Sequence, residues 1–382
     1  MAARKALFRK LKLHHNGELQ AAGGGAKPGA SVAASLRAEP PLGFRVFGDA
    51  LDMSTDASLI EALSTTARRA LEPHTPDQPY ALLDFPGHSN VGDSAIWTGE
   101  MAYLRRYARA MPAYVASLRD FSIDDLRQRC PNGPIYIHGG GNFGDVWPHH
   151  QAFRNRLLEQ TRGQPLIQFP QSIHFASPQK RDETARLIER HGRFTLFVRD
   201  HESLDLARRH FQCDTILCPD MAFFIGPIAR PRAADLDVLC LLRTDAETSG
   251  LARQAISDLS LRVTDWLGEP RTRLRVTKAW GALRAAILQG PGAFRFGAFN
   301  SAAEARVRRG SDLLASGRAV VTDRLHTHIL CLLLGIPHAV LDNNYGKVSR
   351  FISCWTSGST LTHRSTSMQS ALDWAKGQAA TA

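Results

Sequence analysis

Short apolar runs alternate with longer amphipathic segments through the first half of the chain. The apolar runs predict strands over residues 80–85, 113–118, 134–138, 165–169, 194–198 and 215–217. The segments between them repeat their apolar residues with the period of a helix, at residues 93–109, 147–160, 178–191 and 201–211. Because alternation of this kind is typical of βαβ units, the pattern predicts a doubly wound parallel sheet.

A second series of apolar runs begins after a proline-rich break at residues 226–232. This series predicts strands over residues 238–242, 273–277, 319–322 and 338–341. The strongly apolar residues 325–334 predict a buried helix, and residues 366–377 predict a final amphipathic helix. We therefore expect two α/β domains with a cleft between them. In open α/β sheets, ligands bind beyond the carboxyl ends of the strands.

The two series also predict the domain boundaries. They assign residues 1–42 to a basic tail and an Ala/Gly-rich linker, 43–228 to an N-terminal α/β domain, 233–355 to a C-terminal α/β domain, and 356–382 to a C-terminal helix and tail. No apolar run approaches the ~20 residues that a membrane-spanning helix needs.

The formal charge of +11 first suggests a nucleic-acid partner, but its distribution weakens that interpretation. Residues 1–40 hold seven Lys and Arg against two acids, and no nucleic-acid motif occurs, so we expect no nucleic-acid partner. A non-catalytic polyanion-binding protein is disfavoured for the same reason. Residues 4–15 mix apolar and basic side chains, which suits either peripheral contact with an anionic membrane or a solvated tail. The six cysteines have irregular spacing without a CxxC pair, so a reduced, cytoplasmic protein is expected.

Three consecutive glycines follow the predicted strand 134–138. The stretch His138-Gly139-Gly140-Gly141-Asn142 leads into an amphipathic segment, so it predicts a tight turn between a strand and a helix. Glycines in such a turn let backbone N–H groups approach an anion at the helix N-terminus, and the alternative is a connection without a ligand. An esterase loop is set aside, because the nearest match to G-x-S-x-G, residues 87–91, lacks the final glycine.

Polar residues that suit an anionic ligand follow several of the predicted strands. Asn90 and Asp93 come after the first strand, Arg199 after the fifth, and Arg324 and His326 after a strand of the second series. Asp93 is either a helix N-cap or a carboxylate that faces the cleft. We expect the two arginines and the glycine turn at helix N-termini, where the helix dipole adds positive potential. Together they predict an anion-binding cleft.

Seven short motifs then occur in a fixed order. They lie at residues 90–93 (Asn-Val-Gly-Asp), 137–142 (Ile-His-Gly-Gly-Gly-Asn), 168–172 (Gln-Phe-Pro-Gln-Ser), 199–200 (Arg-Asp), 219–220 (Pro-Asp), 323–326 (Asp-Arg-Leu-His) and 343–347 (Asn-Asn-Tyr-Gly-Lys). Each motif is short, but their collinear order is specific. On these motifs the chain resembles the polysaccharide pyruvyl transferase family, over the region from about residue 80 to residue 355.

The resemblance implies a GT-B-like fold, in which two Rossmann-like domains face a cleft. It also implies transfer of pyruvate from phosphoenolpyruvate onto a sugar, which forms a ketal across two hydroxyls and releases phosphate, with no metal or organic cofactor. The acceptor is expected to be a sugar of a bacterial-type polysaccharide or of its lipid-linked precursor. A lipid-linked acceptor would bring a cytoplasmic enzyme to the inner membrane face, with contact through residues 4–15.

The resemblance also implies roles for individual residues. Arg199, Arg324 and Leu325 match the donor-binding positions, and arginine suits both groups of phosphoenolpyruvate by bidentate pairing. His326 is expected to act as the general acid and base, and Asp93 as a base. The other matching residues are expected along the acceptor side of the cleft: His138, Gly139, Gly140, Gly141, Asn142, Asn90, Gln171, Ser172 and Lys347.

One alternative keeps the fold and changes the donor. Glycine turns and a cationic cleft also suit the diphosphate of a nucleotide sugar, so a GT-B glycosyltransferase remains open at this stage. The sequence offers no clear pocket for a nucleotide base, which favours the pyruvyl transferase.

Overall fold

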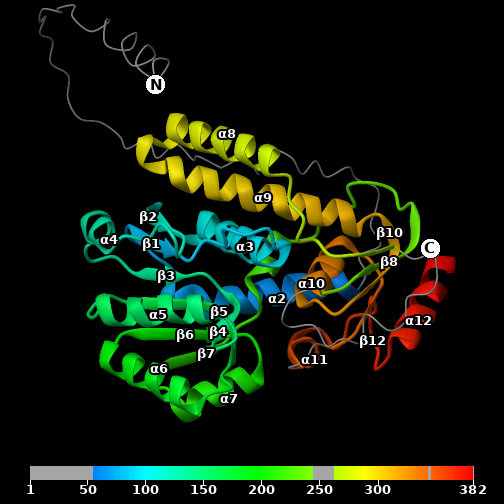
Figure 1. Cartoon of the computed structure of the whole chain (residues 1–382), viewed down its shortest axis with the longest axis horizontal. Helices are drawn as coiled ribbons and strands as arrows, with labels where there is room; N and C mark the ends of the chain where they lie inside the picture. Colours follow the sequence, from blue (N-terminus) through cyan, green and yellow to red (C-terminus); the bar gives the residue numbers. More distant parts are fainter. Residues whose placement is uncertain (1–54, 244–261, 343–345, 382) are drawn as a thin grey trace, which may run out of the picture. The chain divides into compact units, whose positions relative to one another are not determined.

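The computed structural model describes residues 55–243, 262–342 and 346–381 (Figure 1). All of these residues belong to one compact unit. The predicted basic tail, its membrane segment 4–15 and residues 343–345 lie outside the described residues. The six cysteines are all described and are free thiols. Among the described helices, none is both long and apolar enough to cross a bilayer.

The first half of the chain forms a seven-stranded sheet, here called sheet A, in which the paired strands are parallel. The strand order is β2-β1-β3-β5-β6-β7, and β4 pairs with β5. Its strands are β1 (Tyr80–Leu83), β2 (Pro112–Ala116), β3 (Ile135–Ile137), β4 (Gly140–Gly144), β5 (Leu166–His174), β6 (Phe194–Val198) and β7 (Asp214–Leu217). The six strands predicted in this half are thus confirmed, with boundaries that shift by a few residues.

Helices cover both faces of sheet A. Alternate residues of each strand point to opposite faces, so each face presents its own set of side chains to the helices. Ala81 and Leu83 pack with the helices of one face, namely α4 (Ile123–Arg129), α5 (Pro148–Gln160), α6 (Pro178–His191) and α7 (His201–His210). Tyr80 and Leu82 pack on the opposite face with α2 (Thr55–Leu71), α3 (Val91–Tyr107) and the short helix η2 (Met221–Ile225). The short helix η1 (Glu72–His74) follows α2. This arrangement confirms the predicted doubly wound sheet.

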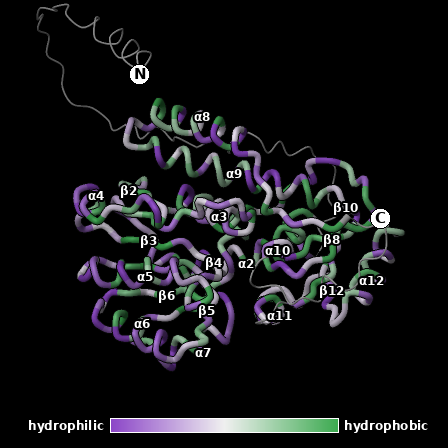
Figure 2. Tube along the Cα trace, viewed as in Figure 1, coloured by the Kyte–Doolittle hydropathy of each residue, from purple (hydrophilic) through white to green (hydrophobic). Residues whose placement is uncertain are grey.

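The second half forms a five-stranded parallel sheet, sheet B, with the order β12-β11-β10-β8-β9. Its strands are β8 (Leu236–Leu241), β9 (Arg262–Thr264), β10 (Gly317–Thr322), β11 (His338–Val340) and β12 (Thr362–Arg364). Helix α10 (Leu325–Leu334) is buried against one face, and α12 (Met368–Thr381) covers the other. Figure 2 shows the apolar character of α10 and of central strands such as β6.

The remaining helices are α8 (Arg271–Gln289), η4 (Pro291–Ala293), α9 (Phe294–Leu314), α11 (Lys347–Phe351) and the π-helix η5 (Ile352–Thr356). Helix α3 contributes to the cores of both sheets, because Val91 and Ala95 pack with sheet B while Ile96 and Trp97 pack with sheet A. The structure is therefore a mixed α/β protein in which packing continues from one sheet to the other.

The predicted strand at residues 273–277 is wrong, because these residues lie in helix α8. Arg273, Leu274, Arg275 and Val276 alternate like a strand, but so short an alternation does not distinguish a strand from one turn of a helix. Close packing on α9 selects the helix. A Cβ on Gly281 would lie 2.6 Å from the backbone oxygen of Gly297 in α9, so small residues let the two helices approach.

The prediction that the three glycines form a turn directly onto a helix is also wrong. Residues 140–144 form strand β4, and α5 begins only at Pro148, so the glycines do not lie at a helix N-terminus. Their small size serves close strand packing instead. At Gly144, where φ is +126°, a Cβ would lie 1.7 Å from the carbonyl oxygen of His174 on β5.

Each sheet contains a topological switch point, where the order of connected strands reverses. The switch point lies between β1 and β3 in sheet A and between β8 and β10 in sheet B. Crevices at the carboxyl ends of strands beside such points are the usual ligand sites of open α/β sheets. Asp84 and His138 directly follow β1 and β3. Arg243 and Arg324 follow β8 and β10 after one intervening residue each, so polar side chains lie at both switch points.

Candidate active site

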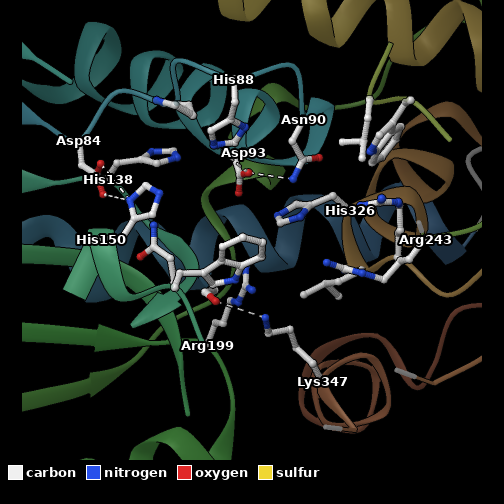
Figure 3. A pocket seen from close by; sticks show the side chains of 18 residues that line it. Asp84, His88, Asn90, Asp93, His138, His150, Arg199, Arg243, His326 and Lys347 are labelled. Carbon is white, nitrogen blue, oxygen red and sulfur yellow. Dashed lines mark hydrogen bonds and ion pairs between the residues drawn. The ribbon is translucent and has the colours of Figure 1, made fainter. Parts of the chain in front are cut away.

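Residues from both switch points line one cavity of about 280 Å³ (Figure 3). Four cationic side chains line it, against two carboxylates: Arg199, Arg243, Arg324 and Lys347, and Asp84 and Asp93. Four histidines complete its polar wall: His88, His138, His150 and His326. The lining therefore contains more cationic side chains than carboxylates, together with four imidazole rings.

Two helices begin at this cavity. Asn90 is the N-cap of α3 and accepts a hydrogen bond from the backbone N–H of Gly92, at 3.2 Å. Arg324 occupies the N-cap position of α10, followed by Leu325 and His326 in the first turn. The positive ends of both helix dipoles thus reach the cavity, which suits an anion. The expected placement of Arg324 at a helix N-terminus is confirmed.

Asp93 lies in the first turn of α3 rather than at its N-cap, and its carboxylate lines the cavity. The Asn90 side chain donates to Asp93 Oδ2 at 2.8 Å, and His88 Nε2 lies 3.6 Å from the same oxygen. Burial would raise the pKa of Asp93, but the charges of His88 and His326 outweigh it and hold the pKa below its ordinary value. The Asp93 carboxylate is therefore ionised at neutral pH.

His326 packs against the same turn of α3. A Cβ on Gly92 would lie 2.7 Å from His326 Nδ1, so glycine at this position makes room for the imidazole. His326 Nε2 lies 3.4 Å from Asp220 Oδ2. Burial would raise the pKa of Asp220, but the hydrogen bond and charge of His326, together with Arg199, hold that pKa well below its ordinary range. The carboxylate of Asp220 thus stays ionised beside the imidazole.

His138 forms a buried pair with Glu100 of α3. Its Nδ1 lies 2.9 Å from Glu100 Oε2, and the backbone N–H of Gly139 donates to Glu100 Oε1 at 2.8 Å. Burial would lower the pKa of His138, but the facing carboxylate raises it, while burial raises the pKa of Glu100. Nε2 of His138 has no hydrogen-bond partner among the described residues, and this imidazole lines the cavity.

Another carboxylate–histidine pair joins Asp84 and His150, with 2.9 Å between Oδ2 and Nδ1. Asp84 is buried and has a φ of +67°, which is uncommon for a residue other than glycine. Strained backbone of this kind concentrates at functional sites. The side chains of Asp84 and His150 face each other at the cavity wall in Figure 3.

The two predicted arginines are held by buried acidic partners. Arg199 Nη1 pairs with Asp220 Oδ2 at 2.5 Å, and Arg324 Nη2 pairs with Asp265 Oδ2 at 2.6 Å. The guanidinium carbon of Arg324 also lies 5.9 Å from the centre of the Trp266 ring. These contacts fix each guanidinium in one orientation while leaving it at the cavity wall.

Gly141 and Lys347 bring the two sides of the cavity together. Lys347 Nζ donates to the carbonyl oxygen of Gly141 at 3.4 Å. A Cβ on Gly141 would lie 2.5 Å from Lys347 Nζ and 3.1 Å from Arg199 Nη2. Only glycine leaves both cations in place. The glycine motif therefore acts by close approach of side chains and not, as expected, through a helix N-terminus.

Most of the predicted site residues meet at this cavity, and four do not line it. The residues that line it are His326, Asp93, Arg199, Arg324, Leu325, His138, Gly141, Asn142, Asn90 and Lys347. Gln171 lies behind the wall, where it hydrogen-bonds Asn142, and Ser172 accepts a bond from Arg199 Nε at 3.0 Å. Gly139 and Gly140 also lie outside the lining.

Several lining residues were not predicted. Arg243 comes directly after the predicted strand 238–242, so the strand-end rule applied to every strand would have found it. Asp84 lies inside the predicted strand 80–85, and only the structure ends β1 at Leu83. Glu100 lies in the middle of α3 and carries no signal in the sequence, because only the fold places it beside His138. Within the described part of the chain, no group of three or more His, Cys, Asp or Glu is placed to hold a metal ion.

The fold and the cavity define an α/β protein in which cationic side chains, carboxylates and imidazoles from both sheets line one cavity. A family model described as polysaccharide pyruvyl transferase matches residues 90–345. Pyruvyl transferase 1 of Schizosaccharomyces pombe is 33% identical over 300 residues, which cover 74% of this chain and 70% of that protein. EpsO of Bacillus subtilis is 29% identical over 289 residues, covering 72% and 84% of the two chains.

A solved structure has the same fold. It is a protein from Klebsiella pneumoniae subsp. pneumoniae NTUH-K2044, with a TM-score of 0.53 at 17% identity, covering 80% of this chain and 99% of that one. The chain belongs to the polysaccharide pyruvyl transferase family, and it is a transferase that acts in pyruvyl transfer onto polysaccharide. The resemblance drawn from the seven motifs is thereby confirmed.

Proposed function

We propose that this transferase takes its pyruvyl group from phosphoenolpyruvate, forms a ketal across two hydroxyls of the acceptor sugar, and releases phosphate. The observation that supports this proposal is the composition of the cavity lining, in which four cationic side chains face two carboxylates. Two helices also begin at this cavity. Phosphoenolpyruvate presents a carboxylate and a phosphate within one small molecule. Both groups suit arginine pairing and helix N-termini.

The donor would bind across the cavity, between cationic side chains that come from sheet A and cationic side chains that come from sheet B. Arg199 follows β6 of sheet A, whereas Arg324 and Lys347 follow strands of sheet B. Because Asp220 and Asp265 already fix the two guanidiniums, little side-chain entropy would be lost on binding. The phosphate and carboxylate could then be held at once, which would orient the reactive carbon between them.

In the first step, His326 donates a proton to the methylene carbon of phosphoenolpyruvate, and an oxocarbenium-like centre forms at the adjacent carbon. The oxygen of a sugar hydroxyl adds to that centre, and its proton passes to Asp93. The bond between the central carbon and the phosphate oxygen then breaks. A second hydroxyl closes the ketal, and its proton leaves with the phosphate. An imidazole and an ionised carboxylate at one turn of α3 suit this division of roles.

His138 would bind the acceptor. Its Nε2 lacks a partner among the described residues, so it can exchange a hydrogen bond with a sugar hydroxyl. Glu100 fixes the orientation of the ring through Nδ1. Asn142 lines the same wall, and Arg154 and Gln171 hold its side chain through Oδ1. The acceptor would be a sugar of a polysaccharide or of its lipid-linked precursor.

Binding and product analysis test this proposal. Phosphoenolpyruvate should raise the melting temperature of the protein, whereas a UDP-sugar should not. Mass spectrometry of candidate glycans incubated with the protein and phosphoenolpyruvate should then show the added mass of a pyruvate ketal, with release of phosphate. Stabilisation by a nucleotide sugar alone would contradict the proposal and favour the glycosyltransferase alternative.

A further inference from the structure

Helix α8 carries a line of large apolar side chains in solvent. Val276, Trp280, Leu283 and Ile287 are 53%, 69%, 48% and 73% exposed. Their spacing of four, three and four residues places them on one face of the helix. We call these four residues the α8 stripe.

The α8 stripe lies opposite the face that packs on the protein. Ala282 and Ala285 are the buried residues of α8, and Gly281 packs closely against Ser301 of α9. At about 100° per residue, the two alanines fall roughly on the far side of the helix from the stripe. Figure 2 shows hydrophobic and hydrophilic residues alternating along α8. Single exposed apolar residues are common, but four aligned on one helix are typical of an interaction surface.

The charge of α8 has one sign. The helix contains five basic residues and no acidic residue: Arg271, Arg273, Arg275, Lys278 and Arg284. Arg273 and Arg284 are exposed and fall on one side of the stripe, at roughly 50° and roughly 70° from its centre. An apolar line that contains a tryptophan and is bordered by arginines on one side is typical of helices that lie in a membrane interface.

The charge also selects between the surfaces that could cover the stripe. Pairing of α8 with the same helix of a second copy would bring five positive charges against five, without a carboxylate on either helix. Anionic phospholipid headgroups complement those charges, and the acyl region accepts the apolar side chains. We propose that the α8 stripe binds the surface of a bilayer that contains anionic phospholipids. This proposal is independent of the donor and of the acceptor.

Vesicle binding by the full chain tests the proposal. The protein should sediment with phosphatidylcholine vesicles that contain phosphatidylglycerol, and not with phosphatidylcholine vesicles alone, and salt should weaken the binding. The double variants W280S/I287S and R273E/R284E should each bind about tenfold or more weakly. The matched control R186E/R208E changes exposed arginines on α6 and α7 and should bind like the unaltered protein.

Tryptophan fluorescence gives a second readout. All six tryptophans lie in the described part of the chain, and Trp280 is the only exposed one among them. Its emission should shift to shorter wavelength on phosphatidylglycerol vesicles, and W280F should abolish the shift. Equal sedimentation of the unaltered protein and W280S/I287S would overturn the proposal, since the N-terminal residues are intact in both. A dimer that W280S/I287S converts to a monomer, without vesicle binding, would overturn it in favour of self-association.

Discussion

His326 is the side chain on which the proposed chemistry most directly depends. Its imidazole lies over Gly92 at the start of α3 and 3.4 Å from the Asp220 carboxylate. Asp93, which follows Gly92, is held ionised by the surrounding histidines. An imidazole and an ionised carboxylate therefore meet at the first turn of α3, although their residues are far apart in the sequence.

Replacing His326 by Ala should lower turnover by about 10²- to 10⁴-fold, because the general acid is removed. The affinity for phosphoenolpyruvate should change little, since the arginines remain. Product formation and calorimetry measure the two effects separately. His201→Ala, on an exposed residue of α7, is the matched control and should retain activity. Full activity of His326→Ala would refute the assignment.

Glu100 should set the pH dependence of the reaction through His138. Burial lowers the pKa of His138, and the Glu100 carboxylate is the main group that raises it, with smaller contributions from Asp93 and Asp84. Glu100→Gln removes the main opposing charge and should therefore lower that pKa. If neutral His138 accepts a hydrogen bond from the sugar, the acid limb of kcat/KM against pH should move to lower pH. An acid limb that stays in place, or moves to higher pH, would exclude this role. Glu304→Gln, on α9, is the control and should leave the profile unchanged.

At the scale of secondary-structure elements, the starting points of two helices determine where the cavity lies. Helices α3 and α10 both start at the cavity, and each brings a motif that the sequence had identified, at residues 90–93 and 323–326. Both motifs follow buried strands, which local patterns predict well. Helix α8, which the sequence misjudged in part as a strand, is decided by packing on α9, and no local pattern contains that packing.

Gly92→Ala tests how closely α3 and α10 must approach. The new methyl group would meet His326 Nδ1 at 2.7 Å and displace the imidazole, so kcat should fall by about 100-fold although alanine favours a helix. Gly87→Ala, where a Cβ would meet nothing within 4 Å, should be neutral. Steady-state kinetics with a melting curve separates a displaced histidine from an unfolded protein. Equal kcat values for the two variants would show that the close approach is unimportant.

For the molecule as a whole, the decisive feature is that the switch points of both sheets contribute to one cavity. Each sheet by itself supplies only part of the positive charge. Arg199 comes from sheet A, and Arg243, Arg324 and Lys347 come from the side of sheet B. A small anion with two charged ends therefore has cations at both ends only in the assembled fold.

Arg324→Ala should weaken the binding of phosphoenolpyruvate by about 10- to 100-fold, because a charge-assisted pair is lost. Arg318→Ala changes an exposed arginine of β10 and should leave the affinity unchanged. Isothermal titration calorimetry of both variants measures the difference. Unchanged affinity in Arg324→Ala would contradict a donor site on this arginine.

The sequence by itself determined the alternation of strands and helices, the residues at the strand ends, and the family, because periodicity and short motifs are local properties of the chain. The tertiary structure decided which carboxylate faces which histidine. Glu100, Asp220 and Asp265 hold His138, Arg199 and Arg324 across long sequence separations. It also placed the three glycines away from any helix N-terminus, and one of them, Gly141, where two cations approach closely. Such contacts depend on how sheets and helices pack, and no local pattern encodes that packing.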